Sequence, residues 1–362
     1  MPAESTPTGV LGHTDQPLAA VYDVALLDLD GVVYVGPNAV PYAAESLDAA
    51  RAAHGMRSAF VTNNAARPPA VVAEHLTQLG VHAAPEDVVI SAQAGARVLA
   101  ERLPAGSRVL AVGGPGVAWA IEERGMLPVT SADDQPAGIL QGYGPNVGWR
   151  QLAEACLAIG AGALWVATNL DRTIPSPRGR VLGNGALVMA VQHATGVTPL
   201  VAGKPEPPLM LESVERTAAV TPLVVGDRLD TDIEGANRSG LPSLLVFTGV
   251  TDWPDLIGVS AELRPTYLAS DLSGLLAPAP TVTVGGDRAQ VVARCGRTEV
   301  TVPIGSGPLE PAADWWRPDE LRGAGDAAEV DLDVVRAVVA AAWRVADLGA
   351  TAEGRAQLGF TP

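Results

Sequence analysis

The 362-residue chain has almost no lysine. A single Lys204 stands against 23 arginines, so arginine carries nearly all of the positive charge. Lysine presents a compact ammonium and arginine a planar fork, and the two do not substitute for each other where space is tight. The composition therefore predicts that Lys204 serves a site that requires a slim cation.

Cysteine and long apolar runs are also scarce. The two cysteines, Cys156 and Cys295, lie far apart in the sequence, which favours reduced thiols in a cytoplasmic protein over a disulfide framework. Residues 1–20 lack a basic start followed by an apolar stretch, so we expect no secretory signal. No apolar run is long enough to span a bilayer, which takes about 20 residues, so we expect no membrane insertion.

Basic residues are outnumbered by acidic ones, 24 to 40. The formal net charge is −16, which argues against nucleic acid or an anionic membrane as the partner. A small anionic substrate stays open, because a metal ion and a few local cations can reverse the sign of the charge inside one cleft.

Apolar residues, by contrast, make up 48% of the chain, and their spacing outlines an α/β protein. A nearly continuous apolar run over 21–34 predicts a strand that is buried on both faces of a parallel sheet. Helix, strand and helix patterns follow it up to residue 80. This alternation predicts a doubly wound parallel sheet with right-handed crossovers.

A second alternating unit interrupts the first. Its strand and helix patterns occupy residues 88–200, and the first pattern resumes at residue 201. We therefore expect a core of residues 21–87 and 201–277 with an inserted α/β cap of residues 88–200, although two sequential domains would fit the same order. For residues 1–20 we expect a flexible arm.

Beyond a linker at 278–280, residues 281–362 predict a small α+β extension. Residues 281–304 alternate with period two around a Gly-Gly pair, which predicts a hairpin or a three-stranded meander. An amphipathic helix is predicted over 330–349. A segment of about 80 residues is marginal for an independent core, so we expect its helix to pack on the core domain or on another subunit.

Two acidic residues follow the first predicted strand. Asp28 and Asp30 lie at i and i+2 before the turn at Gly31, where the strand opens into the crevice in which open α/β sheets bind ligands. Carboxylates this close have their proton affinities driven apart unless they hold a cation. One could attack phosphorus while the other exchanges protons with the leaving group and water; two solvated aspartates are the plainer alternative.

A third acidic position ends another predicted strand, at Asp227. Mg²⁺ is usually held by one or two carboxylates together with waters and a substrate phosphate, and Asp28 and Asp227 from neighbouring strand ends would form such a pair. Asp232 is placed to support a bound water or Lys204 from behind. For Asp230 we expect a solvated loop residue.

Neutral polar residues, Thr62, Asn63 and Asn64, end the second core strand. Their hydroxyl and backbone N–H groups could bind phosphate oxygens, although helix caps and turns use the same residue types. Lys204 precedes a proline, which disfavours helix at that position. Its ammonium could screen Asp28 from an incoming phosphate and stabilise the equatorial oxygens in the transition state.

In this order, four segments resemble the motifs of the haloacid dehalogenase-like (HAD) hydrolases. The insertion between the second and third motifs resembles the C2 cap of the NagD and p-nitrophenylphosphatase-like branch, and the resemblance covers about residues 22–277. The four segments are LLDLDG (26–31), FVTNN (60–64), GKPEP (203–207) and GDRLDTD (226–232).

The resemblance implies a Mg²⁺-dependent phosphomonoester phosphatase, in which Mn²⁺ or Co²⁺ could replace the metal. It implies that Asp28 is the nucleophile, through an aspartyl phosphate, and that Asp30 is the general acid and base. Asp28, the backbone carbonyl of Asp30 and Asp227 would hold the metal, with Asp232 in support.

The phosphoryl group would be held by Thr62, Asn63 and Lys204. The carboxylate at Asp30 also separates branches of the superfamily: dehalogenases lack it, and P-type ATPases carry threonine in its place. Both are therefore disfavoured for this chain.

The resemblance places substrate specificity in the cap. The candidate substrate-binding residues are Asn64 on the core side and Asn169, Asp171 and Arg172 in the cap loop. Asp171 could accept hydrogen bonds from substrate hydroxyls and Arg172 could close over the phosphate, although each fits a solvated loop equally well. No Tyr or Trp lies between 166 and 190 to stack on a ring, which favours a small polyol phosphate.

The extension resembles the one found on actinobacterial glycerol 3-phosphate phosphatases, which is partly acetyltransferase-like (GNAT). RGAGDA (322–327) fits the pattern with which acetyltransferases hold the pyrophosphate of coenzyme A. No predicted strand directly precedes it, and the extension is too short for a complete acetyltransferase. We therefore expect a structural or regulatory appendage.

These observations predict a cytoplasmic phosphatase that acts on a small phosphate ester. Glycerol 3-phosphate, yielding glycerol and phosphate, is the best candidate substrate. Phosphoglycolate, pyridoxal phosphate and nucleoside monophosphates stay open, as does a homo-oligomeric state. Two rival functions fit the same residues: a phosphomutase, which would pass the phosphate to a sugar, and a metabolite sensor that binds without turnover.

Overall fold

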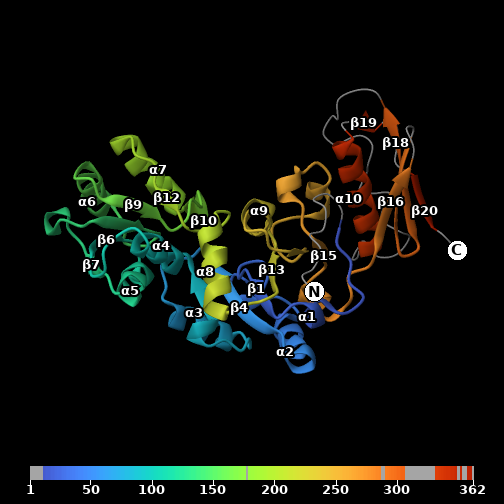
Figure 1. The fold of residues 1–362 in the computed structure, drawn as a ribbon, viewed down its shortest axis with the longest axis horizontal. Coiled ribbons are helices and arrows are strands. Elements are labelled where there is room, and N and C mark those ends of the chain that lie inside the picture. Colours follow the sequence, from blue (N-terminus) through green and yellow to red (C-terminus); the bar gives the residue numbers. More distant parts are fainter. Residues whose placement is uncertain are drawn as a thin grey trace.

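The computed structural model describes residues 11–176, 178–286, 290–305, 331–348, 351–352 and 357–360. Three parts follow one another along the long axis of the molecule, with the core in the middle, the inserted cap at one end and the C-terminal extension at the other (Figure 1). In the described part of the chain, no helix combines the length and apolar character that a membrane crossing needs.

The core is a six-stranded sheet in the order β15-β14-β13-β1-β4-β5, and every neighbouring pair is parallel. The predicted doubly wound parallel sheet is thus confirmed. All residues of the two central strands β1 and β13 are buried, as a sheet covered on both faces requires. The strands are β1 (Val24–Leu27), β4 (Arg57–Thr62), β5 (Val88–Ile90), β13 (Pro222–Gly226), β14 (Ser243–Val246) and β15 (Tyr267–Ala269).

The helices of the core form two groups. In the first, helix α2 contacts α1 and the 3₁₀ turn η6. In the second, α8 contacts α9 and also helix α4 (Ser91–Ala100) of the cap. Helix α2 ends at Gly55, which adopts a left-handed conformation (φ 74°) that glycine favours at a helix end. The core helices are α1 (Leu18–Val21), α2 (Ala43–His54), α3 (Pro69–Gln78), α8 (Pro207–Thr217), α9 (Glu234–Arg238) and η6 (Leu272–Leu276).

The cap has its own parallel sheet, in the order β12-β9-β8-β6-β7. Helices α6 and α7 pack together, and α4 and α5 pack together against the sheet. An antiparallel hairpin, β10 (Thr173–Ser176) with β11 (Gly179–Leu182), was not predicted. The other elements are α4 (Ser91–Ala100), β6 (Arg108–Val112), α5 (Pro115–Glu123), β7 (Leu127–Val129), β8 (Gly138–Gln141), α6 (Trp149–Gly160), β9 (Leu164–Ala167), α7 (Asn184–Thr195) and β12 (Leu200–Val201).

The two crossings between core and cap lie slightly away from the expected boundaries. Residues 88–90, which we assigned to the cap, form β5 and pair with β4 of the core sheet. Val201, which we assigned to the core, belongs to β12 and pairs with Ala167 of the cap sheet. Short apolar runs fit either sheet, and only the pairing partner decides between them.

The cap is attached to the core by charged and backbone contacts. Glu212 of α8 is fully buried and pairs with Arg216 of its own helix, with Arg97 of α4 and with Arg124 beyond α5. Nearby, the Gly116 N–H donates to the Ala66 carbonyl of the core at 3.0 Å. A buried carboxylate needs such partners, so these contacts fix where the cap sits.

The described part of the extension is an antiparallel sheet with one helix, as the sequence predicted. Its strands pair in the order β16-β17-β18, and β18 also pairs with β19 and β20. The Gly-Gly pair lies within β16 rather than in the turn, and RGAGDA (322–327) lies outside the described residues. The elements are β16 (Val282–Gly286), β17 (Gln290–Cys295), β18 (Thr298–Gly305), α10 (Leu332–Asp347), β19 (Thr351–Ala352) and β20 (Gln357–Phe360).

The expected flexible arm is wrong for residues 11–20. Leu11 and Leu18 are buried, and α1 packs on α2. The Gly12 N–H donates to the Thr266 carbonyl at 2.8 Å, and the Thr14 N–H donates to the Ala279 carbonyl at 3.0 Å. This segment therefore covers the β15 edge of the core sheet; residues 1–10 lie outside the described part of the chain.

Candidate active site

Three acidic side chains converge at the carboxyl ends of the core strands. Asp28 directly follows β1, Asp227 directly follows β13, and Asp232 lies in the turn η3 (Leu229–Ile233). One carboxylate oxygen of each lies within 4.8 Å of the others. Because parallel strands end at the same edge of a sheet, residues nearly 200 positions apart meet where ligands bind.

Lys204 lies among these carboxylates. Its Nζ donates to Asp28 Oδ1 at 2.6 Å, to Asp232 Oδ1 at 2.7 Å and to the Val61 carbonyl at 3.1 Å. The side chain is almost fully buried. Burial alone would lower the pKa of Lys204, but the charges of Asp232 and Asp28 outweigh it and raise the pKa above its usual value, so the ammonium is retained.

Asp227 is held in one orientation with one oxygen left over. Its Oδ2 accepts the Val250 N–H at 2.7 Å, whereas no donor among the described residues reaches its buried Oδ1. A side chain at Gly31 or Gly249 would overlap this carboxylate. Burial, with the charges of Asp232 and Asp28, raises the pKa of Asp227 to about 7.

This arrangement fits a divalent cation. Both Asp232 oxygens already accept protein donors, from Lys204 and from the Arg228 N–H, so Asp28 and the free oxygen of Asp227 are the carboxylates left to bind one. An unpartnered buried carboxylate oxygen is otherwise costly, and hard oxygen ligands are those Mg²⁺ prefers. The support role predicted for Asp232 agrees with its two hydrogen bonds.

Asp30 lies apart from the carboxylate cluster. It is exposed and leads into a small hairpin, β2 (Tyr34–Val35) with β3 (Asn38–Ala39). Although the residue is exposed overall, neighbouring groups cover part of its carboxyl, and this partial burial raises its pKa; the Gly36 backbone hydrogen bond and the charge of Arg228 oppose the rise. A raised pKa suits a group that must give up a proton.

The polar residues after β4 differ in their surroundings. Thr62 is mostly buried, and its hydroxyl oxygen accepts the Asn64 N–H at 3.1 Å. Asn64 is exposed, and its side chain accepts the Ala66 N–H at 2.9 Å in a turn. Asn64 thus also serves the turn that we weighed as its alternative role.

The Asn63 side chain links the core to the cap. Its Oδ1 accepts the Lys204 N–H at 2.8 Å, and its Nδ2 donates to the Lys204 carbonyl at 3.0 Å and to Asp171 Oδ1 at 3.2 Å. These bonds occupy both polar atoms of the Asn63 amide group. The side chain positions Lys204, a role that the sequence did not indicate.

The cap loop 169–172 rests on three consecutive residues at the start of α7. The Asn184 side chain donates to the Asn169 carbonyl at 2.8 Å. The N–H groups of Gly185 and Gly183 donate to the carbonyls of Asp171 and Arg172, each at 2.9 Å. A side chain on either glycine would overlap the loop backbone, so the loop has one defined position.

Within this loop, the three predicted substrate-binding residues lie in different environments. Asn169 is buried and donates to the Asn63 carbonyl at 2.7 Å, which makes it part of the cap-to-core contact. Asp171 lies near Asn63, Arg228 and Lys204: burial raises the pKa of Asp171, and these three residues oppose the rise. Arg172 is exposed.

Sequence reasoning missed two further polar groups near the site. Arg228 donates to both oxygens of Asp230, at 3.0 and 2.8 Å, so the predicted solvated Asp230 is exposed but paired. Tyr34 hydrogen-bonds to Arg67. Burial, together with the charges of Asp28 and Asp30, raises the pKa of Tyr34. Arg228 stands inside the segment GDRLDTD, a signal that could have identified it.

Comparison with known proteins agrees with this geometry. The model of the haloacid dehalogenase-like hydrolases matches residues 25–126, and that of HAD-hydrolase-like proteins matches residues 201–275. A D-glycerol 3-phosphate phosphatase of Mycobacterium tuberculosis is 44% identical over 343 residues, 91% of this chain and 89% of that protein. The chain belongs to the haloacid dehalogenase-like hydrolases and is a phosphatase of that family.

Two solved structures place it within the family. The glycerol phosphate phosphatase of M. tuberculosis, crystallised with magnesium, superposes with a TM-score of 0.75 at 42% identity and covers 91% of this chain and 92% of its own. A p-nitrophenylphosphatase variant of Geobacillus stearothermophilus gives 0.63 at 32% identity, over 70% of this chain and 97% of its own. The shorter relative therefore lacks a counterpart of part of this chain.

Proposed function

We propose that this protein hydrolyses glycerol 3-phosphate to glycerol and inorganic phosphate, with Mg²⁺ as its metal and Mn²⁺ or Co²⁺ as substitutes. The observation that carries the proposal is the buried ammonium of Lys204 beside Asp28, with a free oxygen of Asp227 at the same strand ends. The M. tuberculosis relative named for this substrate supports the choice of ester.

In the first step, a carboxylate oxygen of Asp28 attacks phosphorus and the ester P–O bond breaks on the opposite side. Asp30 gives its proton to the departing glycerol oxygen. The Lys204 ammonium and the N–H and hydroxyl groups of Asn63 and Thr62 hold the phosphoryl oxygens as charge develops on them. The result is an aspartyl phosphate on Asp28 and free glycerol.

In the second step, Asp30 takes a proton from a water molecule as that water attacks the phosphorus of the aspartyl phosphate. The bond between phosphorus and the Asp28 oxygen breaks, so inorganic phosphate leaves and both acids return to their starting states. Water rather than a sugar hydroxyl accepts the phosphoryl group, which distinguishes this reaction from that of a phosphomutase.

Asp28, Asp227 and the Asp30 carbonyl would hold Mg²⁺, with Asp232 behind them. When bound, the metal neutralises charge on the phosphate and on Asp28. The unpartnered oxygen of Asp227 and its raised pKa are both features that a cation at this position would remove.

The cap loop selects the leaving group. Asp171, held by Asn63 at 3.2 Å, accepts hydrogen bonds from the glycerol hydroxyls, while Asn64 and Arg172 line the approach. Arg228, fixed by Asp230, adds positive charge on the same side. A carboxylate that recognises hydroxyls discriminates against esters that lack them, because it would then be left unpaired.

The proposal extends to the cellular location of the protein and to its oligomeric state. We place it in the cytoplasm, since its two cysteines are free thiols, one buried and one partly buried. A homo-oligomer through the cap is supported by exposed apolar side chains there, among them Trp149 and Met189. Cell fractionation and light scattering, respectively, test these two statements.

Phosphate release from a panel of small phosphomonoesters, with Mg²⁺ and with EDTA, tests the proposal. We expect metal-dependent release that is highest for glycerol 3-phosphate. Asp28→Asn should release phosphate at less than about 1% of the wild-type rate, because a neutral amide does not attack phosphorus. Release spread evenly over the panel would refute the substrate, and release by Asp28→Asn would refute the nucleophile.

A further inference from the structure

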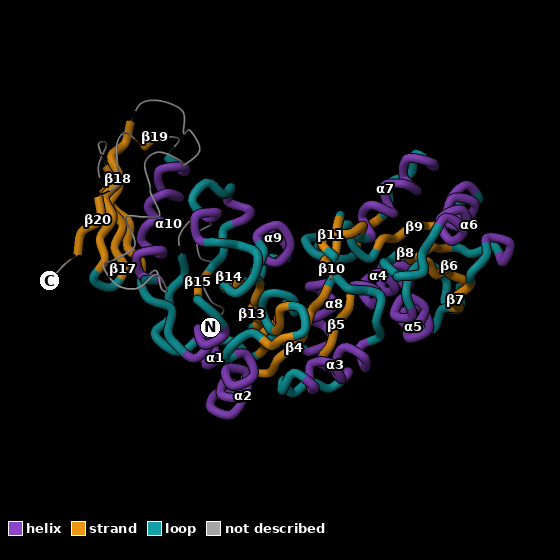
Figure 2. The backbone as a smooth tube through the Cα atoms, turned by 180° about the vertical axis from the view of Figure 1, so that it is seen from behind, coloured by secondary structure: helices purple, strands orange, loops and turns teal. Residues whose placement is uncertain are grey.

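Helix α10 of the extension lies between the extension's own sheet and the core. Figure 2 shows it beside β17 and β18 with the core on its other side, and it contacts both β17 and β15. Ten of its residues are buried, and they share one apolar cluster with Leu245, Trp253 and Leu256 of the core. The extension is thus packed onto the catalytic domain through this helix.

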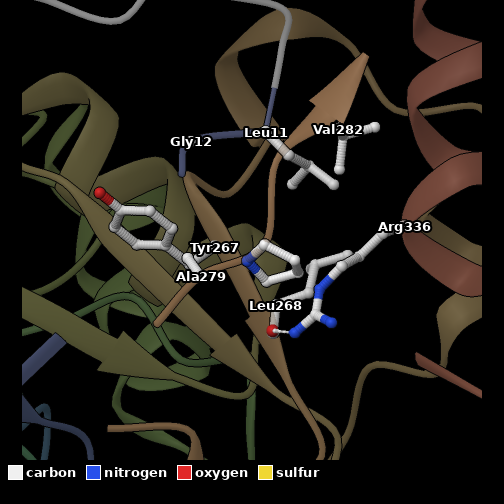
Figure 3. A pocket seen from close by; sticks show the side chains of 8 residues that line it. Leu11, Gly12, Tyr267, Leu268, Ala279, Val282 and Arg336 are labelled. Atoms are coloured by element: carbon white, nitrogen blue, oxygen red, sulfur yellow. Dashed lines mark hydrogen bonds between the residues drawn. The ribbon is translucent and has the colours of Figure 1, made fainter. Parts of the chain in front are cut away.

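Three polar contacts fix α10 to the core, one in its first half and two in its second half. A nitrogen of Arg336 donates to the Leu268 carbonyl at 2.8 Å, beside the small cavity shown in Figure 3. Trp343 Nε1 donates to the Leu256 carbonyl at 2.7 Å. Asp347 pairs with Arg264 at 2.8 Å, and that guanidinium lies 5.2 Å from the centre of the Trp343 ring.

The Trp343 contact falls on a segment that starts at the metal site. The Val250 N–H donates to Asp227 Oδ2 at 2.7 Å, and the Thr251 N–H donates to the Asp227 carbonyl at 3.1 Å. The chain then enters the 3₁₀ turn η4 (Trp253–Leu256), which Asp252 caps through the Trp253 N–H at 2.8 Å.

This segment is held at both ends by hydrogen bonds. Thr251, Trp253 and Leu256 are buried, while Val250, Asp252 and Asp255 face solvent. The buried side of the segment can transmit a displacement from one end to the other, because packed interiors deform little. It connects the Leu256 carbonyl, held by α10, to the carboxylate of Asp227.

We propose that the extension acts on catalysis by positioning the metal-binding carboxylate of Asp227 through residues 250–256, with Trp343 as the positioning residue. The inference rests on the metal site of the proposed function and assigns no catalytic group to the extension. Since coupling between two sites is reciprocal, Mg²⁺ binding must in turn strengthen the docking of α10.

The first test compares two variants that each lose one hydrogen bond from α10 to a core carbonyl. Trp343→Phe loses the bond to Leu256 and keeps a ring at that position. Arg336→Met loses the bond to Leu268, away from the metal site, together with the ion pair to Asp333 within α10. By calorimetry without substrate, we expect the Mg²⁺ dissociation constant to rise roughly 3- to 10-fold in Trp343→Phe, and less than about twofold in Arg336→Met.

Hydrogen exchange of the wild-type protein provides a second test, which does not depend on a variant that folds. Adding Mg²⁺ should slow amide exchange in residues 331–348, whose local opening would be coupled to the metal site. Unchanged exchange there, unchanged affinity in Trp343→Phe, or equal loss in both variants would each overturn the coupling. Absence of Mg²⁺ binding by the wild type would overturn the proposed function itself.

Discussion

Lys204→Arg keeps the positive charge of the site, yet we expect it to lower kcat roughly 10²- to 10³-fold, the usual loss when one transition-state donor is misplaced. The Lys204 nitrogen meets three acceptors with its three donors, at 2.6, 2.7 and 3.1 Å, in a pocket where the side chain is 3% exposed. A guanidinium is wider, and its donors diverge in one plane. It cannot reach Asp28, Asp232 and Val61 from one point.

Lys204→Met separates charge from shape. It leaves Asp28 and Asp232 close together without the cation between them, and an uncompensated buried charge costs about 3–5 kcal/mol. In the metal-free protein we expect a clear loss of thermal stability, which added Mg²⁺ partly restores because the cation occupies the same cluster of carboxylates.

Both variants are measured by steady-state phosphate release at saturating Mg²⁺ and substrate, with circular dichroism to confirm the fold. Lys204→Arg within about tenfold of the wild-type kcat would refute the argument, because tenfold corresponds to only about 1.4 kcal/mol of transition-state stabilisation. It would mean that the scarcity of lysine in this chain has no bearing on the site.

Three further predictions concern the cap loop and the metal site. Asn184→Leu removes the donor to the Asn169 carbonyl, so this buried carbonyl loses a hydrogen-bond partner. KM for glycerol 3-phosphate should then rise roughly tenfold, with a smaller change in kcat. Initial-rate measurements test this expectation. Asp171→Ala should raise KM for glycerol 3-phosphate and leave KM for p-nitrophenyl phosphate within about twofold, since only the former offers hydroxyls; equal effects on both would contradict the assigned role. The third prediction concerns pH, because the pKa of Asp227 is raised to about 7. In the metal-free protein, the contribution of Asp227 to stability is fully present below its unfolded pKa of about 4 and is lost as the pH rises through 7. Calorimetric scans should show that Mg²⁺ raises Tm more at about pH 8 than at about pH 5.5, because a protonated carboxyl does not bind the metal.

The strands of the core sheet could be predicted because each strand can be identified from its own residues. β1 and β13 are buried along their whole length, and a strand buried on both faces must be apolar throughout, which the sequence displays directly. Asp28 and Asp227 could be predicted for a related reason: polar residues at the carboxyl end of such a strand have little alternative but to face the ligand crevice. Lys204 contacts Asp28 and Asp232, and one carboxylate oxygen of Asp227 lies within 4.8 Å of one from each of these acids, so the segments do converge.

Contacts between segments were harder to predict. Residues 11–20 contain few apolar side chains, and their order depends on backbone hydrogen bonds to Thr266 and Ala279, which any sequence can make. Val88–Ile90 could complete either sheet. The roles of Asn63 and Asn184 were missed because an amide side chain bonds equally well to substrate, turn or backbone, and only the folded neighbourhood chooses.

Asn63 shows why phosphate binding and substrate selection are not separable in this protein. One side chain fixes both backbone polar groups of Lys204 and also donates to Asp171 in the cap. Its carbonyl accepts from Ser91 of α4 and from Asn169 of the cap loop. If the cap loop 169–172 moves so that a different leaving group fits, Asn63 must therefore be displaced as well, and Asn63 positions the Lys204 backbone. Substitutions that alter specificity at Asn169 or Asn184 should consequently alter kcat as well as KM, whereas a change at the exposed Arg172 has no such path to Lys204.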